Sequence, residues 1–184
     1  MFPILFTTLL GSTEGTETLS VAKDVFDGKE DLLLNPWSIR RFPFGAPSGQ
    51  ATPRVSCVTY AVTGKIRDLF EQFNAPLERL CLEQGQIVDY ARKNRVQILA
   101  GGVTCCLVRT GRNLEWDTHI RREEGGYTFH FSNLYIVGFG SLGPYGWEPR
   151  SRDGRLDYRV EAFHDDHCCE PWELKKGRML VPAL

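Results

Sequence analysis

Residues Leu114 to Phe139 read LEWDTHIRREEGGYTFHFSNLYIVGF, and this stretch decides the fold class that we expect. Apolar and polar side chains alternate from Leu114 to Arg121, and the alternation resumes after Gly125-Gly126. A period of two on both sides of a glycine turn is typical of a β-hairpin with one buried face and one solvated face. The stretch therefore predicts an antiparallel hairpin.

The register of this hairpin brings two histidines together. A turn centred between residues 124 and 125 sets Ile120 opposite Phe129 and, on the polar face, His119 opposite His130. Cross-strand neighbours have Cβ atoms roughly 4.5–5.5 Å apart. With Asp117 on the same face, the two imidazoles are candidate catalytic residues, either as general acid and base or as ligands of a metal ion that activates water.

A second cluster of metal-binding residue types lies between Phe163 and Glu170. Imidazole, carboxylate and thiolate all bind zinc, and the candidate ligands here are His164, Asp166, His167 and Cys168. The sequence contains no Cys-x-x-Cys pair that would strengthen a zinc motif. We therefore expect no cofactor, with zinc as the alternative.

The rest of the chain predicts a single α+β domain over residues 1–184, with a mainly antiparallel, meander-like sheet. Apolar residues at helical spacing predict two or three helices at about residues 63–93, packed on one face, with Thr63 as an N-cap and Asn94 as a stop. A short helix is also expected at residues 20–26. Apolar or β-branched runs predict strands at residues 54–62, 96–100, 103–109, 134–137, 156–162 and 178–184. The apolar start, residues 1–10, predicts a buried first strand.

Residues 11–53 predict a loop-rich N-terminal arm, because prolines and glycines interrupt any period. Two regions carry the aromatic and arginine residues that anchor protein interfaces, namely this arm and the glycine-rich loop at residues 138–154. The expected partner-contact residues are Trp37, Arg40, Arg41, Tyr145 and Trp147.

Composition narrows the function classes. The chain has 184 residues, and its 22 basic and 23 acidic residues give no basic excess of the kind typical of a nucleic-acid groove. The apolar start is too short to span a bilayer and does not resemble a signal peptide, so we expect no membrane association.

Four of the six cysteines sit in adjacent pairs, and neighbours on a strand point to opposite faces. Free thiols, a reducing compartment and a cytoplasmic location are therefore expected.

One glycine motif is typical of dinucleotide-binding proteins, but the residues that follow it do not fit that function. Gly138, Gly140 and Gly143 match the spacing of the dinucleotide-binding fingerprint after an apolar strand. In that motif the pyrophosphate binds at the N-terminus of a helix that follows directly. Here Pro144 and Pro149 follow, and they disfavour a helix at this position. A surface loop is the better interpretation.

The leading hypothesis is a non-catalytic binding or assembly protein that acts through a protein partner or self-association. The alternative is a metal-dependent hydrolase, such as a phosphodiesterase or nuclease, that uses the histidine and carboxylate residues. A weaker alternative is nucleic-acid binding through arginines of the arm and the loop, namely Arg40, Arg41, Arg150, Arg152 and Arg155.

Overall fold

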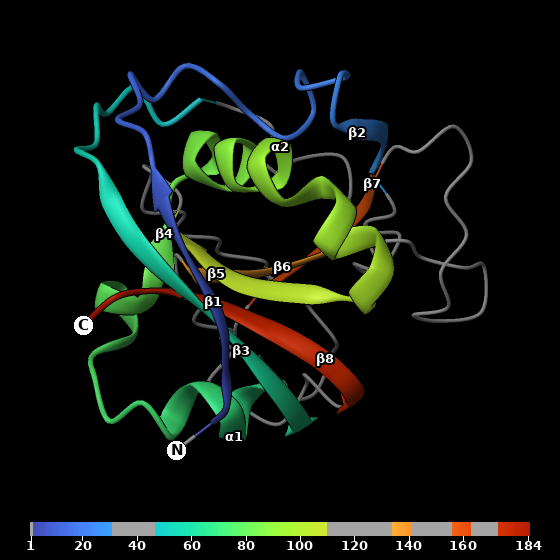
Figure 1. Cartoon of the computed structure of the whole chain (residues 1–184). Coiled ribbons are helices and arrows are strands. Elements are labelled where there is room, and N and C mark those ends of the chain that lie inside the picture. Colours follow the sequence, from blue (N-terminus) through green and yellow to red (C-terminus); the bar gives the residue numbers. More distant parts are fainter. Residues whose placement is uncertain (1, 31–46, 110–133, 141–155, 163–172) are drawn as a thin grey trace, which may run out of the picture.

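The computed structural model describes residues 2–30, 47–109, 134–140, 156–162 and 173–184, and their elements form an α+β fold (Figure 1). The strands are β1 (Ile4–Leu10), β2 (Phe26–Glu30), β3 (Val55–Lys65), β4 (Cys81–Leu82), β5 (Thr104–Arg109), β6 (Leu134–Gly140), β7 (Leu156–Ala162) and β8 (Glu173–Pro182). The helices are α1 (Ile66–Glu71) and α2 (Gln84–Gly101), with a short 3-10 turn, η3 (Leu77–Leu80), between them.

The described strands form one mixed sheet in the order β1-β3-β8-β5-β6-β7-β2, and β4 pairs with β5 beside this path. Four of the pairings are antiparallel, whereas β8 with β5, β4 with β5, and β2 with β7 are parallel. The α+β class is confirmed and most of the pairings are antiparallel, but the sheet is partly parallel, so the expectation of a meander-like sheet is wrong. For the pair of β4 and β5 the physical reason is that α2 connects them as a crossover, and a crossover returns the chain parallel to the strand it left.

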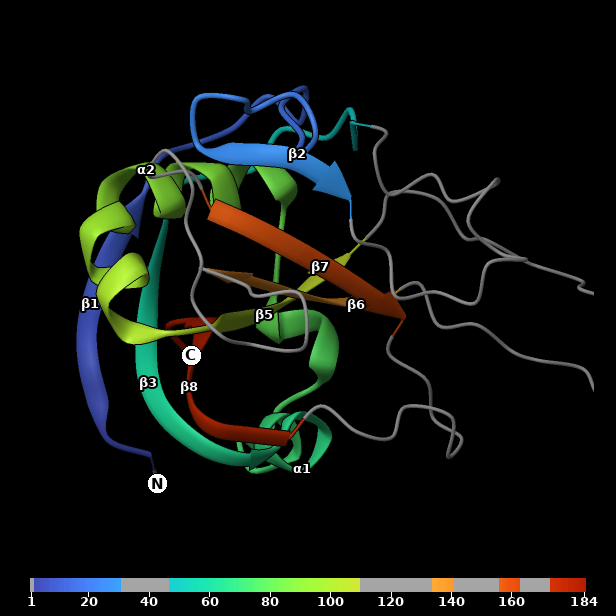
Figure 2. The same cartoon turned by 90° about the vertical axis from the view of Figure 1, so that its right-hand side faces the viewer.

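The centre of the sheet is buried on both faces. Under α2 lies one apolar cluster, to which β5 contributes Cys106 and Val108. On the opposite face, Cys105 and Leu107 of the same strand pack into a second cluster with residues of α1 and η3. The two helices thus cover opposite faces (Figure 2), and the prediction that the helices pack on one face is wrong.

Helix α2 is longer than the sequence indicated. Its first turn carries a capping box, in which the Gln86 side chain accepts a hydrogen bond from the Glu83 amide at 3.0 Å. The predicted stop, Asn94, is instead a kink (φ −118°, ψ 20°), and the helix continues to Gly101 through the segment predicted as a strand at residues 96–100. The Asn94 side chain donates to the carbonyl of Tyr90 at 2.9 Å, which accounts for the local bend.

Of the other predicted elements, most strands and the first helix are confirmed, and two predictions near the N-terminus and at the start of α1 are wrong. The predicted strands near residues 54–62, 103–109, 134–137, 156–162 and 178–184 are confirmed as β3, β5, β6, β7 and β8, and the first predicted helix as α1. Lys65, not Thr63, is the N-cap of α1, and the expected helix at residues 20–26 is replaced by turns that lead into β2. In the part of the chain that the structure describes, no helix is long and apolar enough to cross a membrane.

Candidate protein-binding edge at strand β1

Strand β1 lies at one end of the sheet order and leaves apolar side chains in solvent. Its only strand partner among the described residues is β3. Relative exposure is 60% for Ile4, 45% for Leu5 and 59% for Leu9, whereas Leu10 is fully buried. No charged residue occurs from Phe2 to Thr13. An uncharged apolar edge of this kind can pair with a further strand, which most proteins prevent with charges or proline.

The hydrogen bonds of β3 define which backbone groups of β1 point outward. The Ser56 carbonyl accepts a hydrogen bond from the Ala183 amide on the β8 side at 2.7 Å. Ser56 is the register partner of Leu9, so this pair does not exchange backbone bonds, and Leu9 directs its N–H and C=O away from β3. By the alternation of an antiparallel ladder, Thr7 does the same.

A β-bulge limits the regular part of this edge. Ile4 pairs with Tyr60 and Phe6 pairs with the adjacent Thr59, which leaves Leu5 as the extra residue. The regular ladder with β3 therefore runs from Phe6 to Leu10. The described residues at the outer edge are thus Thr7 and Leu9 in regular geometry, with Leu5 in the bulge.

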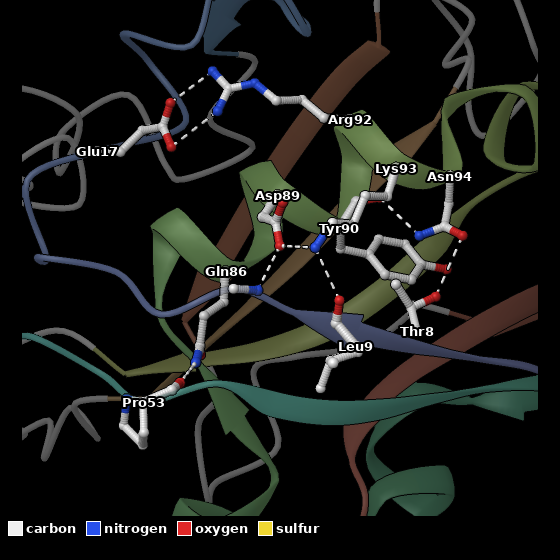
Figure 3. A network of polar contacts seen from close by, with 11 residues as sticks. Thr8, Leu9, Glu17, Pro53, Gln86, Asp89, Tyr90, Arg92, Lys93 and Asn94 are labelled. Carbon is white, nitrogen blue, oxygen red and sulfur yellow. Dashed lines mark hydrogen bonds and ion pairs between the residues drawn. The ribbon is translucent and has the colours of Figure 1, made fainter.

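The C-terminal end of β1 is tied to α2 by a charged pair (Figure 3). The Lys93 ammonium donates to the Leu9 carbonyl at 2.9 Å and to Asp89 Oδ2 at 2.7 Å. The same carboxylate oxygen accepts the Gly11 amide at 2.7 Å. Lys93 therefore occupies one outward group of the edge, while the outward groups of Thr7 have no described partner within residues 2–30 and 47–109.

The inner face of β1 is fixed by polar and aromatic contacts beneath α2. The Thr8 hydroxyl donates to Asn94 Oδ1 at 3.3 Å, and the Phe6 ring stacks on Tyr90 with centroids 6.5 Å apart. The Tyr90 hydroxyl is hydrogen-bonded to Thr59 Oγ1 at 2.9 Å, and both residues are fully buried. Burial raises the pKa of Tyr90 to about 12. Tyr90 is therefore neutral at physiological pH and serves as a packing and hydrogen-bonding residue.

A surface ion cluster holds the segment after β1 against α2. Arg92 pairs with Glu17 at 2.7 Å and with Asp24 at 2.8 Å (Figure 3 shows the Glu17 contact). The hydrogen bond from Arg92 lowers the pKa of the Asp24 carboxyl, and its bonds to Asp24 and Glu17 raise the pKa of the guanidinium. All three side chains are at least one-third exposed, so solvent weakens these pairs.

The described thiols are structural. Cys57, Cys105 and Cys106 are free, as expected, and all three are buried. Burial raises the pKa of Cys57 to about 12 and also raises the pKa values of Cys105 and Cys106. A thiol with a raised pKa is a poor nucleophile, so these three thiols are inert core residues.

The two arms and the turn of the predicted hairpin up to residue 133, and the site residues predicted from the sequence, lie outside the described residues. These site residues are the catalytic candidates Asp117, His119 and His130, the zinc candidates His164, Asp166, His167 and Cys168, and the partner-contact candidates Trp37, Arg40, Arg41, Tyr145 and Trp147. Within the described ranges, no group of three or more His, Cys, Asp or Glu residues is placed to hold a metal ion. The metal-dependent hydrolase stays a prediction, and elemental analysis of protein purified without chelator tests it.

The apolar composition of residues 1–10 predicted a buried strand, so the exposed edge of β1 was not expected. The strand exists, but it is buried on its inner face only. Thr7 and Thr8 in its middle were the available signal, since a strand buried on both faces is usually a near-continuous run of aliphatic residues. Comparisons with protein-family models, with curated proteins and with solved structures find no match for this chain.

Proposed function

We propose that this chain is a non-catalytic binding or assembly protein that acts through protein–protein contacts, and that β1 is one of its contact surfaces. The observation that carries the proposal is an uncharged edge strand with Leu5 and Leu9 about half exposed. Strand addition at such an edge gives affinity through backbone hydrogen bonds and specificity through alternate side chains. The partner segment is therefore an extended, uncharged peptide.

The anchoring of β1 supports a preformed surface. Thr8 contacts Asn94, and Lys93 and Asp89 fix Leu9 and Gly11, so the strand does not need to be ordered when a partner binds. Because ordering a segment opposes association, a strand held in place by its own helix binds more tightly than a free one.

Thr7 offers a sharp test, because its N–H points outward and does not belong to the ladder with β3. Proline at such an edge position removes one outward donor and leaves the ladder intact. A library of displayed ten-residue peptides is panned on the immobilised full chain, and the selected peptides are compared on Thr7→Pro and on the matched control Thr7→Val, which keeps the N–H.

We expect peptides with alternating apolar residues that bind the wild type and Thr7→Val alike and lose about tenfold or more in affinity on Thr7→Pro. Equal binding to all three proteins contradicts the assignment of β1 as a contact surface. If no peptide is enriched, the proposed binding at this edge is wrong.

A further inference from the structure

The geometry points to a second copy of this chain as the occupant of the β1 edge, in an antiparallel twofold pairing centred on Thr7. This inference rests on the proposed function, because it names the partner for the same edge. The pairing sets Thr7 opposite the partner's Thr7 and Leu5 opposite the partner's Leu9, so the sheet continues from one copy into the next.

Charge is the first argument for this occupant. A strand that pairs here must set no charge against the exposed Leu5 and Leu9, because desolvating an unpaired charge opposes binding. The segment from Phe2 to Thr13 carries none, and Lys93 at the end of this edge is paired with Asp89, so two copies of β1 meet with no unpaired charge between them. β1 of a second copy is thus an uncharged, apolar strand of the kind that this edge requires. Every molecule supplies both the edge and the strand that pairs with it.

The open backbone groups select the register. The N–H and C=O of Thr7 both face outward without a described partner, so two copies exchange two N–H···O bonds at this position. In this register the Leu5 N–H of each copy is also directed to the Leu9 carbonyl of the other, so Lys93 leaves that carbonyl when the dimer forms. A twofold centred on Thr8 would direct the Thr7 N–H to the same carbonyl. It would also set Thr7 against Leu9, whereas the Thr7-centred register pairs leucine with leucine.

The length of the strand determines how tight the dimer is. Seven residues span about 24 Å, and the bulge at Leu5 shortens the regular part. A stable interface buries roughly 800 Å² on each partner, which is more than one short strand covers. We therefore expect a weak dimer that forms with increasing concentration, not a permanent one.

The experiment is sedimentation velocity of the full chain from low micromolar to high micromolar concentration. The wild type and Thr7→Val are expected to shift from monomer to dimer, with a dissociation constant about tenfold or more higher for Thr7→Pro, which lacks the donor in both copies. Chemical denaturation shows whether Thr7→Pro is folded.

A pair of double variants tests the register even where proline perturbs folding. Leu5→Lys with Leu9→Lys sets like charges against each other across the twofold, so the dimer is lost. Leu5→Glu with Leu9→Lys sets opposite charges against each other, so a dimer is retained and weakens in high salt. These side chains are exposed, so neither pair of changes is expected to unfold the protein.

Three results overturn the inference. The wild type stays monomeric at every concentration, the dimer is indifferent to Thr7→Pro, or both double variants lose the dimer equally. If the wild type stays monomeric but displayed peptides bind in a Thr7-dependent way, the proposed function stands and only the second copy is wrong. If the peptides also fail, both ideas fail.

Discussion

The two sides of β1 differ in how many of their side chains and backbone groups contact other parts of the same chain. On the inner side, Phe6, Thr8 and Leu10 meet Tyr90, Asn94 and the core under α2. On the outer side, Thr7 and Leu9 face solvent, and Lys93 satisfies a single carbonyl. Since successive residues of a strand point to opposite faces, adjacent substitutions separate stability from association.

The largest expected difference is between Leu10→Ala and Leu9→Ala. Leu10 is fully buried, so its truncation is expected to lower the free energy of unfolding by about 2–5 kcal/mol. Leu9 is 59% exposed, and its truncation is expected to change the free energy of unfolding by less than about 0.5 kcal/mol. Urea denaturation followed by circular dichroism measures both. Similar losses for the two variants would show that the outer side also packs against a part of the chain.

Next in size is the buried hydrogen bond that holds the inner side in place. Tyr90→Phe leaves the buried Thr59 hydroxyl without its partner, and we expect a loss of about 1–3 kcal/mol in the free energy of unfolding. The control is the double variant Tyr90→Phe with Thr59→Val, which removes both polar groups and is expected to recover part of the loss. A double variant that is less stable than Tyr90→Phe would contradict the assignment.

The same tyrosine makes stability depend on alkaline pH. Burial raises the pKa of folded Tyr90 from its ordinary value of 10.0 to about 12, so its contribution to stability is complete below pH 10 and is lost as the pH rises toward 12. The wild type is expected to lose on the order of 2 kcal/mol more than Tyr90→Phe over this range. Denaturation at several alkaline pH values measures the difference, and parallel curves would exclude Tyr90 as the group responsible.

The sequence was a good guide to elements with a single local signal. The apolar runs of β5 and β6 and the helical spacing of Ile66, Leu69 and Phe70 each produced the element expected. The segment at residues 96–100 failed, because a short apolar run is compatible with both a strand and a buried helix. In the structure this segment forms the end of α2, and Ile98 is fully buried in the core.

The order of the strands in the sheet and the exposed edge at β1 could not be predicted from the sequence, for a different reason. Leu77, Leu80 and Cys81 have helical spacing in the sequence, but Cys81 and Leu82 form β4, so that α2 becomes a crossover between parallel strands. Whether Leu9 is exposed depends on which strand lies next to β1, and that is a property of the whole sheet. Local pattern therefore identified the strand but not its open side.

The smallest expected effect concerns the segment after β1, which exposed ion pairs hold in place of buried contacts. The hydrogen bond from Arg92 lowers the pKa of Asp24 below its ordinary value of 3.8, so the stabilisation is present above pH 3.8 and is lost as the pH falls through the folded pKa. The side chains of Arg92 and Asp24 are 41% and 59% exposed, so Asp24→Asn is expected to lower the free energy of unfolding at pH 7 by less than about 1 kcal/mol. The difference from wild type is expected to shrink both below pH 4 and at high salt, because acid protonates the carboxylate and salt screens the pair. Glu17→Gln is the matched control, since it removes the charge of the second partner of Arg92 and leaves Asp24 in place. If Asp24→Asn keeps its full effect at high salt, packing against α2, and not charge, holds this segment.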